Sequence, residues 1–497
     1  MPDAETDCKI LERVTRYGMD VLKNWWNTSS KQEKTVQILV VLLVFTYSAY
    51  INNASVSIAA GLAGAYILYD CYQKKSFSGF RMPRENWIGI AIFLGSVLLA
   101  SLLLRDQASI HMAFKYVYWA LPFILAAYLG KLADIRYAAA VGALLSVAVS
   151  SINVTYLNYL LLQGNELVGP GGPVIGGRLG AFLSYPTHYA HLLACTFPLL
   201  LCFYTDKKLR GNSLVAAIST AVTVLGLWSL WKTGSRGGMI ALFAGGIFIF
   251  GLFCYFQKQG RLFLKGLAAG VAVVAVVLLA GIQDGNRTYG DSARVRMWKA
   301  SYAMWQDHKL LGVGLENWQK EYANKYILKD EIKKAVRQQY LGWKKEEERR
   351  VAATQKSKPQ LTAEQMVAAK RAEAKRDEDS IAEWQKVIIK QESAFDMPHN
   401  VIAWFFSTTG IIGGIGYCLF VLYYGRLFYS KLKESHDEWI LYVGLWTFLA
   451  VTIHGMVDAG ITNKEAARLL FLILGIVLNL RPVEREKNLA KLTENIY

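Results

Sequence analysis

The sequence predicts an all-α polytopic membrane protein with about twelve transmembrane helices and one long, largely helical loop on the outer side of the membrane. Three observations predict this class. Hydrophobic residues make up 53% of the 497-residue chain, more than a soluble protein normally carries. Apolar stretches long enough to cross a hydrocarbon core of about 30 Å recur along the chain. A hydrophilic segment at 283–399 interrupts the series.

Residues 1–35 precede the first apolar stretch and are predicted to form a cytoplasmic segment on the membrane surface. Acidic residues come first, and apolar residues then recur at helical spacing among Lys and Arg, as at Ile10, Val14 and Val21. This pattern is typical of an amphipathic helix in the interfacial plane. It lacks the features of a cleavable signal peptide, so we expect no such peptide.

Twelve apolar stretches are long enough to be transmembrane helices. Nine lie within 36–282 and three within 400–480, which leaves the outer segment at 283–399 and a cytoplasmic tail at 481–497. We expect the spans near residues 36–52, 54–73, 87–104, 113–130, 137–160, 188–204, 213–231, 238–256, 265–282, 400–425, 439–457 and 466–480.

Lys and Arg in the short connections predict the orientation, because cytoplasmic loops carry more of these residues. If the N-terminus is cytoplasmic, basic clusters fall in the cytoplasmic connections, which are 74–84, 131–136, 207–210, 258–265 and 426–433. The opposite short loops carry only Arg105, Arg178, Lys232 and Arg236. The segment 283–399 is therefore predicted to face outward, and both termini inward.

The outer segment divides into two parts. From Arg294 to about Tyr326 it carries aromatic residues at helical spacing, followed by the glycine turn 311–314, and we expect this part to be packed. From about residue 329 to 390 it is mostly charged, so we expect solvated helices that are broken at Pro359. A solvated face or a lid is favoured over a binding site for this charged stretch.

The net charge of +17 does not indicate nucleic-acid binding, because the excess lies mainly in the predicted cytoplasmic connections, where it suits anionic membrane lipids. Six cysteines fall in the N-terminal segment or in spans, so no disulfide framework is expected. No His, Asp or Glu cluster has metal-ligand spacing, and no phosphate-binding loop motif occurs. We therefore expect no metal and no cofactor.

The pair His399-Asn400 stands where the outer segment meets the next apolar helix. Nine residues follow before Gly410, and Gly413 comes one helical turn later, a spacing of small residues that lets helices approach closely. An imidazole at a membrane surface can take a proton at physiological pH, which makes His399 a candidate general base. The alternative is that the pair only caps its helix after Pro398.

Four arginines on the predicted outer side suggest an anion site, since Arg pairs with phosphate through two parallel hydrogen bonds. Arg236 lies in the tight turn 234–238, Arg178 lies in a glycine-rich loop, and Arg294 and Arg296 open the outer segment. The alternative is that each side chain merely extends to the membrane interface. That alternative is weaker for Arg236, because no acidic residue is close in sequence.

Three further residues are candidates for supporting roles. Asn400 could orient His399 or cap the helix. His188, at the start of the sixth span, could line a cavity or belong to the interfacial aromatic belt, which we favour. Asp458 could pair with His454, four residues earlier, or orient an arginine of the site.

Four motifs taken together resemble the bacterial O-antigen ligase and O-antigen polymerase superfamily. They are the Gly234-Ser235-Arg236-Gly237-Gly238 turn, the Arg294-x-Arg296-x-Trp298 opening, the Leu311-Gly312-Val313-Gly314 turn and His399-Asn400-x9-Gly410-x-x-Gly413. Within the superfamily, the His-Asn pair followed by nine residues and Gly-x-x-Gly looks most like the ligase branch. The charged stretch at 329–390 is longer than that pattern leads us to expect.

The resemblance implies a glycosyltransferase of the bacterial inner membrane that acts in lipopolysaccharide biosynthesis. Such ligases move polysaccharide from undecaprenyl diphosphate to a sugar hydroxyl of the lipid A-core on the periplasmic face. In this sequence the resemblance implies His399 as the base and Arg236, Arg294 or Arg296, and Arg178 as diphosphate contacts. Direct attack would be inverting and would need neither ATP nor a metal.

Two other classes remain open. An O-antigen polymerase or a protein O-oligosaccharyltransferase would use the same donor with a different acceptor. A membrane transporter would show paired broken helices and ionisable residues near the middle of the bilayer, whereas the charged residues here gather at the predicted outer edge.

Overall fold

The computed structural model describes residues 26–164, 174–175, 177–183, 185–206, 209, 212–282, 287–354, 363–458 and 460–479. Residue contacts divide the chain into two units, each described by itself below. Unit 1 comprises Met1–Ser96, Ala113–Asp284 and Gly416–Tyr497, and unit 2 comprises Val97–Met112 and Gly285–Ile415. Most of the N-terminal segment and all of the tail at 481–497 lie outside the described residues.

Seven described helices are long and apolar enough to cross a membrane. They lie at Asn53–Lys74 (α3), Arg84–Leu104 (α4), Gln107–Leu132 (α5 and α6), Arg136–Leu162 (α7), Ser213–Lys232 (α11), Arg236–Phe256 (α12) and Val401–Glu434 (α18). The chain is therefore an α-helical protein with several apolar helices, as expected. The total of twelve spans and the outer position of 283–399 stay predictions.

The other five expected spans also fall on helices. Four correspond to α2 (Lys31–Ala49), α13 (Gly260–Ile282), α19 (Trp439–Gly455) and α20 (Lys464–Leu478). The stretch at 188–204 is instead three short pieces, α8 (Pro186–Thr196), the 3₁₀ turn η2 (Phe197–Leu201) and α9 (Cys202–Thr205). Pro198 accounts for the change, because its ring blocks the backbone hydrogen bond that a continuous α-helix needs.

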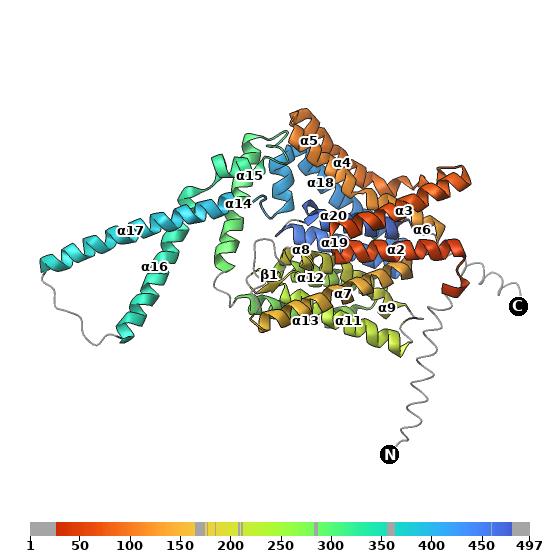
Figure 1. Cartoon of the computed structure of the whole chain (residues 1–497), viewed down its shortest axis with the longest axis horizontal. Coiled ribbons are helices and arrows are strands. Elements are labelled where there is room, and N and C mark those ends of the chain that lie inside the picture. Colours follow the sequence, from red (N-terminus) through yellow and green to blue (C-terminus); the bar gives the residue numbers. More distant parts are fainter. Residues whose placement is uncertain are drawn as a thin grey trace, which may run out of the picture. The chain divides into compact units, whose positions relative to one another are not determined.

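The core of unit 1 surrounds α20, which is buried along almost its whole length. This helix contacts α6 (Leu121–Leu132), α8, α19 and α2 (Figure 1). Buried Asn463 caps it by accepting hydrogen bonds from the backbone N–H groups of Glu465 and Ala466. From Leu469 to Leu478 this helix is apolar on all sides, which suits the interior of a bundle.

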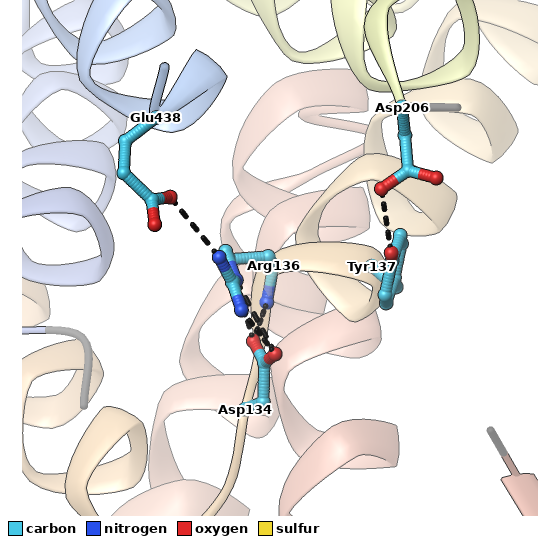
Figure 2. Close-up of polar contacts among 5 residues, drawn as sticks. All are labelled: Asp134, Arg136, Tyr137, Asp206 and Glu438. Atoms are coloured by element: carbon cyan, nitrogen blue, oxygen red, sulfur yellow. Dashed lines mark hydrogen bonds and ion pairs between the residues drawn. The ribbon is translucent and has the colours of Figure 1, made fainter. Parts of the chain in front are cut away.

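A polar cluster joins three connections at one end of unit 1 (Figure 2). Arg136, the first residue of α7, forms an ion pair with Asp134 at 2.8 Å and a second with Glu438 at 3.1 Å. The neighbouring Tyr137 hydroxyl donates to the Asp206 carboxylate at 2.7 Å. The three connections involved precede α7, follow α9 and precede α19, and the charge pattern assigned all three to the cytoplasmic side.

Unit 2 contains most of the hydrophilic segment and is largely helical. Its elements are α14 (Arg287–Asp307), α15 (Trp318–Glu321), a π-helical turn η3 (Tyr322–Tyr326), α16 (Lys329–Thr354) and α17 (Ala363–Ser393) (Figure 1). The first part is packed as expected, since Trp318 and Tyr322 are fully buried and stack with ring centroids 4.9 Å apart. The predicted break at Pro359 lies outside the described residues.

Candidate functional site

His399 lies at the start of α18 and is held from both sides. The Trp298 indole donates a hydrogen bond to the Pro398 carbonyl at 2.9 Å, which ties the preceding residue to α14. The Asn400 side chain accepts from the Ala403 N–H at 2.9 Å, so Asn400 caps α18. The His399 imidazole is half-buried and meets the Phe395 ring edge-on at 5.8 Å.

The backbone of His399 is unusual, with a φ of +51°. A residue other than glycine rarely adopts this left-handed conformation, although His does so more often than most. Such a conformation persists only where the surroundings impose it, and it is more frequent at functional sites. Here the Trp298–Pro398 hydrogen bond and the Asn400 cap hold the residues on either side of His399.

Arg294 and Arg296 lie on α14 but have different surroundings. Arg296 is only 3% exposed and forms an ion pair with the fully buried Glu392 on α17, through both its Nε and its Nη2. The Tyr322 hydroxyl donates to the same carboxylate at 3.0 Å. The Arg296 guanidinium is therefore engaged inside the packed part of unit 2.

Arg294 is half-buried and stands one helical turn before Trp298 on the same face of α14. Because Trp298 is bonded to Pro398, Arg294 belongs to the face of α14 that approaches the start of α18. Of the two arginines at this position in the sequence, Arg294 is therefore the one that shares its helix face with Trp298, whose indole is hydrogen-bonded to the residue before His399. Sequence reasoning could not separate the two, since Glu392 is 96 residues away from Arg296.

The two glycine motifs of unit 2 form one structural feature. Helix α18 leaves helical geometry at Gly410, where φ is +62° and ψ is −157°. The N–H groups of Val313 and Gly314 donate to the carbonyls of Ser407 at 2.8 Å and Thr408 at 2.9 Å. In return the Ile411 N–H donates to the Lys309 carbonyl at 2.8 Å. The turn at 311–314 therefore satisfies backbone groups that the break in α18 leaves open.

Close backbone contact explains why both positions are glycine. A Cβ atom at Gly312 would lie 2.5 Å from the Thr409 nitrogen, and one at Gly410 would overlap the carbonyl of Leu310. This differs from the expected role, in which Gly410 and Gly413 would let neighbouring helices approach. Gly413 faces the Thr409 side chain of its own helix instead, because the break at Gly410 changes the direction of the chain.

Arg178 and Arg236 come together in unit 1. Arg178 lies in β2 (Arg178–Leu179), which pairs antiparallel with β1 (Val174–Ile175). Its Nε donates to the carbonyl of Thr233 at 2.7 Å. Thr233 ends α11, and the turn that follows it leads directly to Arg236. Arg178 is thus hydrogen-bonded to the turn that precedes Arg236. This contact differs from the alternative in which Arg178 only extends to the membrane interface.

Arg236 is the half-buried first residue of α12. The preceding residue, Ser235, caps this helix by accepting from the Gly238 N–H at 3.2 Å. A cation in the first turn opposes the helix dipole, and an anion near this turn would offset that effect. The N–H groups of the first turn favour the same kind of ligand.

Two buried histidines lie behind this turn. The rings of His191 on α8 and His454 on α19 stack with centroids 4.1 Å apart and planes 17° apart, and both residues are at most 1% exposed. A Cβ atom at Gly237 would lie 3.5 Å from the His454 ring. The first turn of α12 therefore packs against His454. Sequence reasoning missed His191, although its place one turn after His188 on the same helix was a usable signal.

His188 and Asp458 border the histidine pair. Both lie within electrostatic range of His191. His188 is half-buried and its ring lies 5.2 Å from that of the 52%-exposed Tyr185. Asp458 is 6% exposed, and its backbone N–H donates to the His454 carbonyl at 2.9 Å. The structure therefore gathers Arg178, Arg236, His188 and Asp458 in unit 1, and Arg294, His399 and Asn400 in unit 2.

Within the described residues, no group of three or more His, Cys, Asp or Glu side chains is arranged to hold a metal ion. In unit 2 the His399 imidazole, just before α18, can accept a proton. In unit 1 the N-terminus of α12, together with Arg178 and Arg236, can bind an anion.

The apolar helices and the long helical insertion define a polytopic α-helical membrane protein. Residues 221–340 of this chain match the family model described as O-antigen ligase, so the resemblance to the O-antigen ligase superfamily is confirmed. The matched region includes Arg236, Arg294, Arg296 and the turn at 311–314, while His399 and Arg178 lie beyond it. A comparison with curated proteins gives no match.

Proposed function

We propose that this protein is an O-antigen ligase of the bacterial inner membrane. It would transfer polysaccharide from undecaprenyl diphosphate to a sugar hydroxyl of the lipid A-core at the periplasmic face, in lipopolysaccharide biosynthesis. The observation that carries the proposal is the family match over 221–340, which spans the helices that hold Arg236 and Arg294. The expected donor and acceptor follow from the ligase branch of the superfamily.

The reaction needs a base, and His399 is the candidate. The acceptor hydroxyl attacks the anomeric carbon of the donor sugar, the bond from that carbon to the diphosphate oxygen breaks, and the hydroxyl proton passes to the imidazole. Attack from the opposite side inverts the anomeric centre. Supporting this role are the half-buried imidazole and its left-handed backbone.

The diphosphate that leaves carries negative charge, and cationic side chains stabilise it as it develops. Arg236, braced by Arg178, supports this role in unit 1, and Arg294 supports it in unit 2. Arg296 is a weaker candidate, because Glu392 already engages it. The role of Arg236 is tested by Arg236→Lys, and that of Arg294 by Arg294→Ala. The proposed step uses only these side chains and does not involve a metal.

The test of function is deletion of the gene in its host, followed by lipopolysaccharide electrophoresis and complementation. Core lipid without polymer, together with polymer accumulating on undecaprenyl diphosphate, is the result expected for a ligase. Loss of long chains with a single repeat still attached would indicate an O-antigen polymerase. Unchanged lipopolysaccharide with unglycosylated outer proteins would indicate a protein O-oligosaccharyltransferase, and either result would overturn the proposal.

The same strain tests the base. His399→Ala should fail to restore ligation while the protein is present at the wild-type level, because no other group in the proposal takes the proton. Asp396→Ala is the matched control: it removes an exposed side chain three residues before His399 that has no part in the proposed step, and it should leave ligation largely intact. Near-normal ligation by His399→Ala would remove His399 from the mechanism.

A further inference from the structure

An open apolar groove of about 850 Å³ runs between α12 and α13 in unit 1. Side chains from both helices form its walls, and one basic residue lies at its end. We refer to it as the α12–α13 groove, defined by Ala244, Phe248, Leu252, Tyr255, Phe263 and Lys258.

The groove is slightly longer than the hydrocarbon thickness of one leaflet. From Ala244 to Phe256, the last residue of α12, the helix rises about 18 Å at 1.5 Å per residue. One leaflet contributes about half of a hydrocarbon core that is about 30 Å thick. The groove begins about 12 Å along α12 from Arg236 and extends away from it, so it is separate from the proposed diphosphate contact.

The two helices pack closely at the wall of the groove. A Cβ atom at Gly270 would lie 2.5 Å from Ile247, which lines the groove, so α13 approaches α12 closely there. On the open side, Phe248 is 55% exposed and Tyr255 is 68% exposed. Such large apolar side chains need an apolar neighbour, which in a membrane is a hydrocarbon chain.

The end of the groove is basic. Lys258 is exposed and stands at the turn between the two helices, with a φ of +56°. Exposed Arg261 follows in the first turn of α13. Among the described residues that line the groove, none is acidic. The Asp437 carboxylate accepts a hydrogen bond from Gln257, the residue before Lys258, at 3.0 Å.

We propose that the α12–α13 groove binds one anionic phospholipid, with an acyl chain along α12 and the phosphate at Lys258. A lysine extends readily from an apolar wall to a headgroup, which keeps its charge in the polar region. The site is independent of the proposed transferase activity, because it rests on the groove and its basic end alone.

The test is native mass spectrometry of the full-length protein in detergent with added phosphatidylglycerol or phosphatidylcholine. The wild type should retain one phosphatidylglycerol more firmly than phosphatidylcholine. Lys258→Gln should reduce phosphatidylglycerol binding about fivefold, the effect of one basic residue beside an anionic surface, and leave phosphatidylcholine unchanged. Lys265→Gln, which removes the same charge from an exposed position outside the groove lining, should change neither.

A second variant tests the part of the groove that would hold the acyl chain. Ala244→Phe fills the groove and should lower the retention of both lipids, with the melting temperature measured to confirm folding. Equal binding of the two lipids by the wild type, or equal effects of Lys258→Gln and Lys265→Gln, would overturn the proposal. Displacement of phosphatidylglycerol by a polyprenyl phosphate would also overturn it and assign the groove to that occupant.

Discussion

Arg296 and Arg294 lie on the same helix, but we expect Arg296 to stabilise the fold and Arg294 to act in the transfer reaction. Arg296 is bound to buried Glu392, which also accepts from Tyr322, while Arg294 lies on the face of α14 near Pro398. Removing one member of a buried ion pair leaves the other charge without compensation in an apolar interior. The two arginines should therefore respond differently to substitution.

Arg296→Ala should lower the free energy of unfolding by about 3–5 kcal/mol, because Glu392 would stay buried without its cation. Arg294→Ala should leave the melting temperature near that of the wild type and reduce ligation instead. Thermal unfolding in detergent measures the first effect and ligation in proteoliposomes the second. The double variant Arg296→Met with Glu392→Leu should recover part of the stability. A wild-type melting temperature for Arg296→Ala would contradict the structural role.

Arg236→Lys tests whether charge alone is enough at the start of α12. A lysine keeps the charge and loses the planar fork that binds phosphate through two hydrogen bonds. We expect a loss of about 2–4 kcal/mol of transition-state stabilisation, or roughly 30-fold to 1000-fold in rate. Ligation by the purified variant in proteoliposomes, with and without a chelator, measures it.

The matched control is Arg105→Lys, at an exposed arginine that is also predicted to face outward. It should be fully active, since a lysine reaches an interface as well as an arginine does. Full activity of Arg236→Lys would rule out a bidentate phosphate contact. Loss of wild-type activity on chelation would rule out the metal-free mechanism.

At the level of elements, the contact between the turn at 311–314 and the break in α18 is the feature most sensitive to substitution. Gly312→Ala should destabilise unit 2 by at least about 1–3 kcal/mol, because its φ is +68° and the added carbon would meet the Thr409 backbone. Limited proteolysis and thermal unfolding in detergent measure the effect.

Gly342→Ala is the matched control. Gly342 lies inside α16 with nothing within 4 Å of an added Cβ atom. The substitution should stabilise the helix by up to about 1 kcal/mol. Equal behaviour of the two variants would show that the contact at Gly312 contributes little.

The elements differ in how far the sequence alone could predict them. Long apolar runs predicted α3, α7 and α12 to within about two residues at each end, because composition and length decide such helices locally. The break at Gly410 was not predicted, since it depends on hydrogen bonds to residues about 100 positions earlier in the chain. The Arg178–Thr233 contact was missed for the same reason, because a loop side chain found a carbonyl 55 residues away.

The candidate site was predicted in part. The residue types and their approximate positions followed from motifs, and the cap formed by Asn400 was one of the two roles anticipated for it. The burial of Arg296 and the His191–His454 stack were not predicted, because both depend on which helices become neighbours. The roles of His399, Arg236 and Arg294 stay predictions that the variants above test.

For the whole molecule, the decisive measurement is the membrane topology. Described native cysteines are buried except for half-buried Cys418, so single cysteines introduced at exposed positions give a clear signal. In intact cells, Glu378→Cys on α17 should react with a membrane-impermeant maleimide. Lys433→Cys, near the end of α18, should react only after the membrane is permeabilised. The reverse pattern would invert the topology and remove the periplasmic assignment.

The pairing of Lys309–Gly314 with Ser407–Ile411 also has a consequence for biogenesis. The ribosome makes the turn about 100 residues before the helix that needs it, so the turn is available as a partner when α18 emerges. Without it, the carbonyls of Ser407 and Thr408 would lose their partners at the edge of an apolar environment, at a cost of several kcal/mol each. If the hydrophilic segment misfolds, the break in α18 would therefore be open to membrane proteases. We expect defects in the turn to lead to degradation of α18 as well.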